Sequence, residues 1–218
     1  MRTADPQAHV KPLLRGVSHE IAAFISFAAW MALLAAAPGS TARAAAGVYG
    51  GTLFTLFLVS ASYHRPNWAP RARLFMRRLD HAAIFFLIAG TYTPFCLILG
   101  GTTGRTMLLV AWGGAALGVL QSIFWPRAPK PVFAASYLLL GWVVVPVLPA
   151  LHAALGSGAI ALLAAGGALY TLGAVVYASR RPDPFPAVFG YHEVFHALVI
   201  AAAACHFAVV AAALRALG

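Results

Sequence analysis

Long apolar runs alternate with short clusters of glycine, proline and basic residues along this chain of 218 residues. Seven of the runs hold about the 20 residues that an α-helix needs to cross ~30 Å of hydrocarbon. The pattern therefore predicts an all-α integral membrane protein built as a seven-transmembrane-helix bundle. The predicted spans are Ile21–Ala37, Ala44–Ser62, Leu79–Leu99, Thr106–Phe124, Val132–Ala150, Gly158–Ser179 and Tyr191–Leu214.

The composition supports this class, because 61% of the residues are hydrophobic and only 9% are charged. A soluble domain carries roughly 25% charged residues. The segments between the spans are short, so we expect one transmembrane domain over residues 21–218, preceded by a cytoplasmic N-terminal segment over residues 1–20. Pro94, Pro146 and Pro149 fall inside predicted spans, where proline kinks or locally unwinds a helix.

Lysine and arginine are divided unevenly between the two sides of the predicted bundle, with twelve on one side and three on the other. Cytoplasmic loops carry an excess of basic residues, so we expect the N-terminus in the cytoplasm and the C-terminus outside. Membrane orientation thus accounts for the net charge of +10, and no nucleic-acid partner is expected. The twelve are Arg2, Lys11, Arg15, Arg65, Arg71, Arg73, Arg77, Arg78, Arg127, Lys130, Arg180 and Arg181, and the three are Arg43, Arg105 and Arg215.

Two histidines, His192 and His196, open the last span four residues apart. On an α-helix this spacing leaves about 40° in azimuth and ~6 Å in rise, so both imidazoles lie on one face. Two neutral imidazoles in this arrangement supply half of a zinc site, although such a pair can also serve only as hydrogen-bonding groups at the membrane interface. Ionisable side chains in a bilayer helix are costly and usually functional, which favours the metal interpretation.

Three further polar residues fall on the same side of the predicted bundle at a similar depth. His64 lies at the end of the second span with Ser60 one turn deeper, and Asp80 opens the third span. The orientation was derived from lysine and arginine alone, so this agreement is independent evidence for a site. We predict that His64, His192 and His196 hold a Zn²⁺ ion, because three histidines with an open fourth position are a catalytic zinc arrangement.

Asp80 and Ser60 are the predicted catalytic residues beside that metal. We expect Asp80 to hydrogen-bond the zinc-bound water and draw off its proton. Ser60 would orient a substrate carbonyl or the same water. The alternatives are a salt bridge between Asp80 and Arg77 or Arg78, and a packing role for Ser60, which is ordinary for serine in membrane helices.

Other ionisable residues near these spans are expected to have lesser roles. His19 and Glu20 open the first span, where they either lie outside the metal ligands or cap the start of the helix. Glu193 points about 100° away from His192 and is expected to face the lipid headgroups. His206 lies over two turns deeper in the last span and is expected to be a core histidine with its hydrogen bonds satisfied.

The polar residues discussed above belong to four short motifs. They are Ser60-Ala-Ser-Tyr-His64, Asp80 ahead of Ala89-Gly-Thr-Tyr-Thr-Pro94, His192-Glu-Val-Phe-His196, and the opening Lys11-Pro-Leu-Leu-Arg15-Gly-x-x-His19-Glu20. These motifs resemble those of the hemolysin III family. The resemblance covers essentially the whole chain. That family is the bacterial branch of the progestin and adipoQ receptor group and is related to alkaline ceramidases.

The resemblance implies a seven-helix bundle in the bacterial cytoplasmic membrane. It also implies a zinc ion held on the cytoplasmic side by His64, His192 and His196, with Asp80 contacting the zinc-bound water and Ser60 nearby. The chain has no counterpart of the long cytoplasmic N-terminal domain of the receptors, so a hormone-receptor role is not expected.

Three functions compete. The favoured one is a zinc-dependent hydrolase that takes a membrane lipid as substrate and cleaves a ceramide-like amide, or less favourably an ester, at the cytoplasmic leaflet. The runner-up is non-enzymatic, either a membrane-perturbing hemolysin or a zinc-dependent sensor. The third is an intramembrane metalloprotease, because His192-Glu193-x-x-His196 satisfies H-E-x-x-H with Glu193 as the base. A site of that kind does not require His64 and Asp80 from distant helices.

Overall fold

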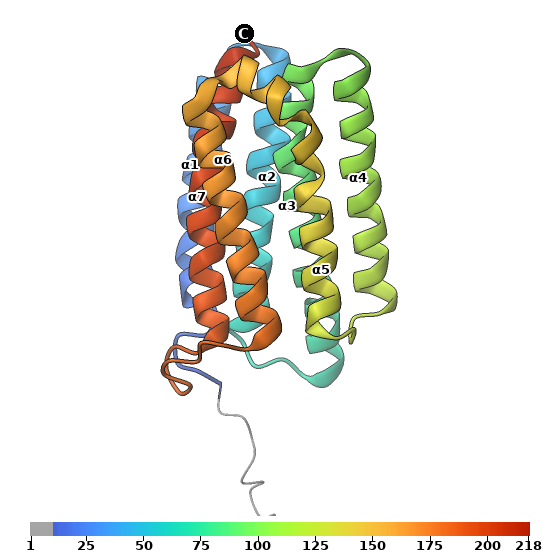
Figure 1. Cartoon of the computed structure of the whole chain (residues 1–218). Helices are drawn as coiled ribbons and strands as arrows, with labels where there is room; N and C mark the ends of the chain where they lie inside the picture. The colour runs from blue at the N-terminus through green and yellow to red at the C-terminus, as the bar shows by residue number, and fades with distance from the viewer. Residues whose placement is uncertain (1–10) are drawn as a thin grey trace, which may run out of the picture.

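The computed structural model describes residues 11–218, which form seven α-helices and one short 3-10 helix (Figure 1). No strand element occurs among these residues, so the predicted all-α class is confirmed. The elements are α1 (Val17–Ala36), α2 (Ser40–His64), α3 (Pro70–Leu99), α4 (Gly101–Phe124), α5 (Lys130–Gly141), the 3-10 helix η1 (Trp142–Val147), α6 (Leu148–Ser179) and α7 (Tyr191–Ala216).

Six helical stretches of the described chain are long and apolar enough to cross a membrane, against the seven spans predicted from the sequence. The difference lies in Lys130–Ser179, which counts as one stretch of 50 residues and comprises α5, η1 and α6. The 12 residues of α5 reach only about 18 Å at 1.5 Å per residue, which is less than the hydrocarbon thickness.

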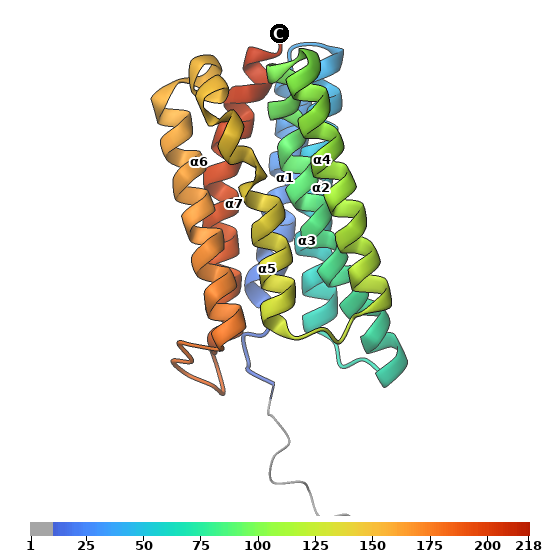
Figure 2. The same ribbon diagram turned by 45° about the vertical axis from the view of Figure 1, so that its right-hand side comes forward.

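The chain reverses its direction within this stretch. Figures 1 and 2 show it running from the end of the bundle where α5 begins to the opposite end, and then returning along α6. The predicted unwinding at Pro146 occurs, because η1 contains this residue. α6 begins at Leu148, inside the span predicted over Val132–Ala150, since Pro149 fits the first turn of a helix. α6 is kinked at Gly156, whose φ of 79° is not helical, so the break predicted between Ala150 and Gly158 is present.

The third helix starts earlier than predicted, at Pro70 rather than at Leu79. Proline is favoured in the first helical turn because its missing N–H has no partner there. The basic stretch that the sequence suggested as a loop is therefore mostly helical. This places Arg73, Arg77 and Asp80 on one helix, α3.

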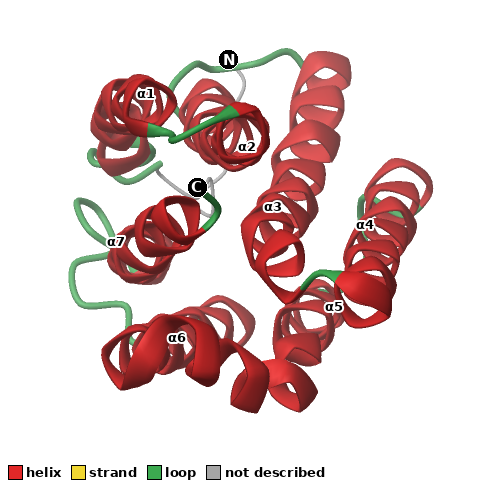
Figure 3. Cartoon of the chain, turned by 90° about the horizontal axis from the view of Figure 1, so that it is seen from above, coloured by secondary structure: helices red, strands yellow, loops and turns green. Residues whose placement is uncertain are grey.

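The helices follow one another around a ring when the bundle is seen along its length (Figure 3). α7 closes the ring, because it packs against α6 and also touches α1, α2 and α3. α4 packs mainly on α3 at the periphery. The last helix therefore adjoins both the first part and the middle of the chain.

Many alanines lie in the interior beside buried aromatic and leucine side chains, and other large apolar side chains cover the outside. Ala46 on α2 and Ala111 on α4 are fully buried. By contrast, Leu109 is 75% exposed and Phe124 is 80% exposed. Small residues let membrane helices approach closely, and an apolar exterior suits lipid contact. Together with the six apolar stretches, these features indicate an integral membrane protein.

One end of the bundle carries most of the basic residues, in the first turns of α3, at the start of α5 and in the connections at that end. These connections are the segment before α1 and the α2–α3, α4–α5 and α6–α7 connections. Two backbone hydrogen bonds join the first and last of them, from Leu13 N to Ala187 O at 3.0 Å and from Leu14 N to Val188 O at 3.1 Å. The described chain begins at this end, and its C-terminus lies at the other (Figure 1).

Gly118 of α4 lies against the ring of Phe85 of α3, so a Cβ atom at position 118 would overlap that ring. We expect Gly118→Ala to lower the stability of the detergent-solubilised protein by about 1–3 kcal/mol, as overpacking does. The measurement is the thermal unfolding midpoint. Gly113→Ala on the same helix is the control, because no heavy atom lies within 4 Å of its added Cβ. Equal midpoints for the two variants would contradict this packing.

Candidate metal centre

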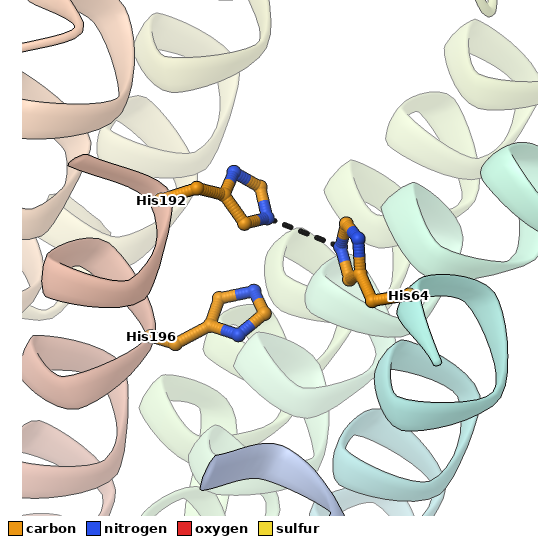
Figure 4. Close-up of side chains that lie close together, drawn as sticks. All are labelled: His64, His192 and His196. Carbon is orange, nitrogen blue, oxygen red and sulfur yellow. Dashed lines mark hydrogen bonds between the residues drawn. The ribbon is translucent and has the colours of Figure 1, made fainter. Parts of the chain in front are cut away.

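Three histidines from two helices meet at the basic end of the bundle. One ligand nitrogen from each of His64, His192 and His196 lies within 4.8 Å of the others. His64 ends α2, and the other two occupy the first turns of α7. The Nε2 atoms of His64 and His192 are 3.1 Å apart, and Figure 4 shows the three rings turned toward a common point. The structure thus brings together the three residues proposed as ligands from the sequence.

The donor set fits a divalent transition metal such as zinc. Imidazole nitrogens are common zinc ligands, and three of them leave a fourth position open. The group is shielded from bulk solvent, because His192 and His196 are buried and His64 is nearly so. The Nδ1 atom of His196 is buried and has no hydrogen-bond partner within residues 11–218. An unpaired buried nitrogen in a cluster of imidazoles is a feature that a bound cation or its partners would relieve.

Asp80 brings a carboxylate from a third helix to the same place. Its Oδ2 atom lies 3.9 Å from His64 Nε2. Among the described residues it forms no ion pair with Arg77 or Arg78, the alternative suggested by the sequence. A carboxylate at this distance does not bond the ring directly, but it lies close enough to contact a molecule held between the two groups.

His19 lies inside the site and does not cap its helix. Its side chain is 3% exposed, and α1 has no side-chain cap at its N-terminus. The ring stacks on His196, with centroids 3.7 Å apart and planes 5° from parallel. Its Nδ1 atom is 2.8 Å from Ser60 Oγ, which ties the predicted catalytic serine to α1. The capping interpretation is therefore wrong, and the alternative of a residue just outside the three-histidine group fits.

Glu193 is buried and does not face the lipid headgroups as predicted. It is 2% exposed, and its Oε1 atom accepts a hydrogen bond from Arg15 Nε in an ion pair. Its Oε2 atom accepts another from the backbone N–H of Gly190 at 2.9 Å. A free glutamate would be needed to act as the base of an H-E-x-x-H site. Since both oxygens are engaged, the metalloprotease interpretation loses its base.

The turns that flank the site fix the positions of its two histidine-bearing helices. Asp183 Oδ1 accepts a hydrogen bond from Tyr191 N at 2.8 Å, which anchors the first residue of α7. Gly16 adopts φ 82°, and an added Cβ would lie 2.8 Å from the Cβ of His64. Glycine is the residue that takes this backbone conformation without strain. The segment before α1 therefore runs directly against the end of α2.

A cavity of about 400 Å³ extends from the three-histidine group into the interior of the bundle. The three histidines, Asp80 and Ser60 line its outer part. Its deeper walls are mainly apolar and include Leu87, Ile88, Phe95, Leu148, Leu163 and Val199.

His206 marks the deep part of this cavity. It lies ten residues beyond His196 on α7, or ~15 Å along the helix. Its Nε2 atom is 3.3 Å from the carbonyl oxygen of Leu163, which agrees with a core histidine that has a backbone partner. His206 is too far along the helix to join the three-histidine group.

Comparisons with known proteins point to one family. A family model described as Haemolysin-III related matches residues 7–207. The chain is 34% identical over 199 residues to Hemolysin-3 of Bacillus cereus, with 89% of this chain and 88% of that protein covered. It is 32% identical over 161 residues to a Hemolysin-3 homolog of Bacillus subtilis (strain 168), with 73% and 72% covered. It is also 31% identical over 175 residues to the Heptahelical transmembrane protein ADIPOR2 of Oryza sativa subsp. japonica, with 72% and 76% covered.

The convergence of the rings predicts that the protein binds zinc in a ratio of about one ion per chain and that His64→Ala loses most of it. Metal analysis of the detergent-purified protein measures the ratio directly. Zinc binding to the folded state increases the free energy of unfolding by RT ln(1 + [L]/Kd), which is about 4 kcal/mol at a thousandfold excess over Kd. Chelation should therefore lower the thermal midpoint of the wild type and leave that of His64→Ala nearly unchanged.

His206→Ala is the matched control, since it also removes a partly buried histidine from the cavity wall. It should keep both its zinc and its sensitivity to chelation. If His64→Ala binds zinc as tightly as the wild type, the three-histidine site is wrong and other residues, His19 and Asp80 first, must supply the ligands.

Proposed function

This chain belongs to the haemolysin-III-related family, and from that premise we propose that it is a zinc-dependent membrane hydrolase. Its substrate is a lipid amide of the ceramide type, or less favourably a lipid ester, at the cytoplasmic leaflet. The observation that carries the proposal is the junction of a three-histidine group and a carboxylate with an apolar cavity. In metal-assisted hydrolysis, histidines hold the metal and a carboxylate can carry the proton. An apolar cavity can bind a lipid chain.

We propose seven crossings, with the N-terminus in the cytoplasm and the C-terminus outside. A straight helix of the 50 residues in Lys130–Ser179 would be ~75 Å long, more than twice the hydrocarbon thickness. The reversal of the chain between α5 and α6 supports two crossings in this stretch. A relative described as heptahelical supports the same count. The excess of basic residues at the end that holds the site supports a cytoplasmic location for that end.

The residues that would hold the metal are His64, His192 and His196. When bound there, a zinc ion would polarise a carbonyl oxygen and make a water molecule a better nucleophile near neutral pH. The stacking of His19 on His196 and its contact with Ser60 Oγ hold these side chains in place. Residues that orient ligands in this way typically affect metal affinity or activity by about 10–100-fold.

Asp80 is the proposed proton carrier. Its carboxylate lies 3.9 Å from His64 Nε2 at the inner mouth of the cavity. There it can accept a proton from an attacking water molecule and deliver it to the departing amine, as a general base and then a general acid. Ser60 lines the same cavity, and its hydroxyl can donate a hydrogen bond to the substrate when His19 Nδ1 carries the proton and donates to Ser60 Oγ. The apolar wall beyond these residues holds the acyl chain and excludes bulk water.

A second candidate function is a membrane-perturbing protein or a zinc-dependent sensor without catalysis. It is favoured by the names of the two Bacillus relatives, which refer to haemolysis. In that function the histidines would stabilise the bundle, and Asp80 would carry no proton. The two candidates differ in what they predict for an Asp80 variant. Only the hydrolase has a turnover rate that the substitution can lower.

The topology proposal predicts that a tag after Gly218 is accessible only from outside the membrane. A tag in the α2–α3 connection, residues 65–69, should be accessible only from the cytoplasm. Labelling of intact cells and of permeabilised cells with an impermeant reagent distinguishes the two sides. Labelling of both tags from the same side would exclude an odd number of crossings.

The catalytic proposal predicts that Asp80→Asn keeps most of its zinc but loses about 10–100-fold or more of its hydrolytic rate, since asparagine cannot accept the proton. The assay measures fatty acid released from detergent-dispersed N-acyl lipids by mass spectrometry, together with metal content. Glu193→Gln is the control. It weakens the ion pair with Arg15 and should lower the thermal midpoint more than the rate per folded molecule. Loss of activity in Glu193→Gln with retention in Asp80→Asn would reverse the two roles.

A further inference from the structure

One face of α3 changes from charged to apolar along the depth of the cavity. Arg73 and Arg77 line its mouth, Asp80 follows beside the histidines, and Ile84 and Ile88 line the wall beyond. Residues three and four apart share a helix face, so this order runs down a single stripe. The cavity thus has a cationic opening, a polar middle and an apolar interior.

A different helix, α5, adds a third cation to the opening. Lys130, its first residue, lines the cavity and donates a hydrogen bond to the hydroxyl of Tyr191. Its ammonium group lies 4.3 Å from the ring centroid of Tyr191 and 4.7 Å from that of Tyr177. These rings hold the ammonium group at the mouth without neutralising its charge.

The positive charge of this opening exceeds the acidic charge of the cavity lining. Arg15 also lines the cavity, but its charge is balanced by Glu193. Within residues 11–218, neither Arg73 nor Arg77 forms an ion pair with an acidic side chain, and Asp80 is the only acidic residue in the lining.

The same excess is felt just outside the opening. Desolvation lowers the pKa of Lys11, and repulsion by Arg65, Arg15 and Arg73 lowers it further. Arg65 and Arg15 are paired with Glu20 and Glu193, so among the three only Arg73 belongs to the unpaired cations of the opening. A concentration of like charge has an unfavourable self-energy that a bound anion would relieve.

We propose that the lipid bound in this cavity carries a phosphate in its headgroup and that Arg73, Arg77 and Lys130 bind that phosphate. The inference names the substrate class of the proposed hydrolase and rests on that function only in taking the cavity as the lipid site. A phosphate offers several acceptor oxygens to guanidinium and ammonium donors. Three separate cations therefore match a phosphate better than they match a single carboxylate. The acyl chain then passes the histidines and enters the apolar part of the cavity.

A general attraction between a basic membrane surface and anionic lipids is the competing explanation for these charges. The chain contains an internal comparison. Arg71 and Arg127 lie at the same end of the bundle, are exposed, and do not line the cavity. Neutralising that pair removes the same charge from the surface while leaving the opening intact.

The test measures the binding of dodecyl phosphate to the full zinc-loaded chain in nanodiscs of neutral phosphatidylcholine, by calorimetric titration. Dodecyl maltoside supplies the same chain with a neutral headgroup, dodecanoate supplies a carboxylate, and inorganic phosphate supplies the anion without a chain. We expect dodecyl phosphate to bind most tightly. The double variant Arg73→Gln, Arg77→Gln should weaken its binding by about 10–100-fold, the loss of two charge-assisted contacts. The double variant Arg71→Gln, Arg127→Gln should bind as the wild type does.

Four results would overturn the proposal: unchanged binding in Arg73→Gln, Arg77→Gln; an equal loss in Arg71→Gln, Arg127→Gln; dodecanoate binding as tightly as dodecyl phosphate; or inorganic phosphate binding as tightly as the lipid. Zinc content is measured for every variant, so loss of the metal site is recognised separately. Selective loss of binding in Arg73→Gln, Arg77→Gln supports the phosphate site even if no lipid amide is hydrolysed, a result that would remove only the hydrolase. Hydrolysis without this selectivity would leave the hydrolase and remove the phosphate site.

Discussion

A buried carboxylate, that of Glu193, determines how the polar end of this bundle is assembled. Burying a carboxylate without partners is strongly unfavourable, so its two oxygens require donors. Arg15 supplies one from the segment before α1, and the backbone of Gly190 supplies the other from the turn before α7. This arrangement links the beginning of the described chain to its last helix. The two histidines that flank Glu193 on α7 consequently face α2 in a fixed orientation.

The same interaction explains why the H-E-x-x-H pattern is misleading in this chain. The pattern describes three residues on one helix, and it does not say which of them is free to react. Here the glutamate is occupied by an ion pair, while a carboxylate on another helix, Asp80, lies beside the histidines. Sequence spacing therefore predicted that the histidines lie together and suggested two bases, and only the partners of each carboxylate distinguish these two.

Much of the fold follows from hydrophobicity and breaker residues, because these are local properties. The ends of α1, α2, α4 and α7 lie within a few residues of their predicted limits. The start of α3 and the end of α5 were less accurate, since proline can start a helix as readily as it ends one and Pro70 and Pro149 do the former. The break predicted before Gly158 is present as the kink of α6 at Gly156, and α6 ends at Ser179 as predicted. The meeting of His64, His192 and His196 could be predicted because basic residues assign a side to each helix end.

The partners of individual polar groups could not be predicted in the same way. Neither the stacking of His19 on His196 nor the pairing of Arg15 with Glu193 has a signal in the spacing of the residues. Both depend on the rotation of helices about their axes, which α1 and α7 acquire only by packing. The depth of His19 in the membrane could be predicted from its position at the start of the first span. The direction of its ring could not, because it depends on tertiary packing.

The distribution of the histidines along the chain also sets an order for biosynthesis. A membrane protein is made from its N-terminus, so the helix that ends in His64 is present long before His192 and His196 exist. Until the last helix is inserted beside α1, α2 and α3, the growing chain has one imidazole of the three and an unpaired Arg15. Any ion held by the three rings must therefore enter after translation of α7, and its presence marks a chain whose two ends have met.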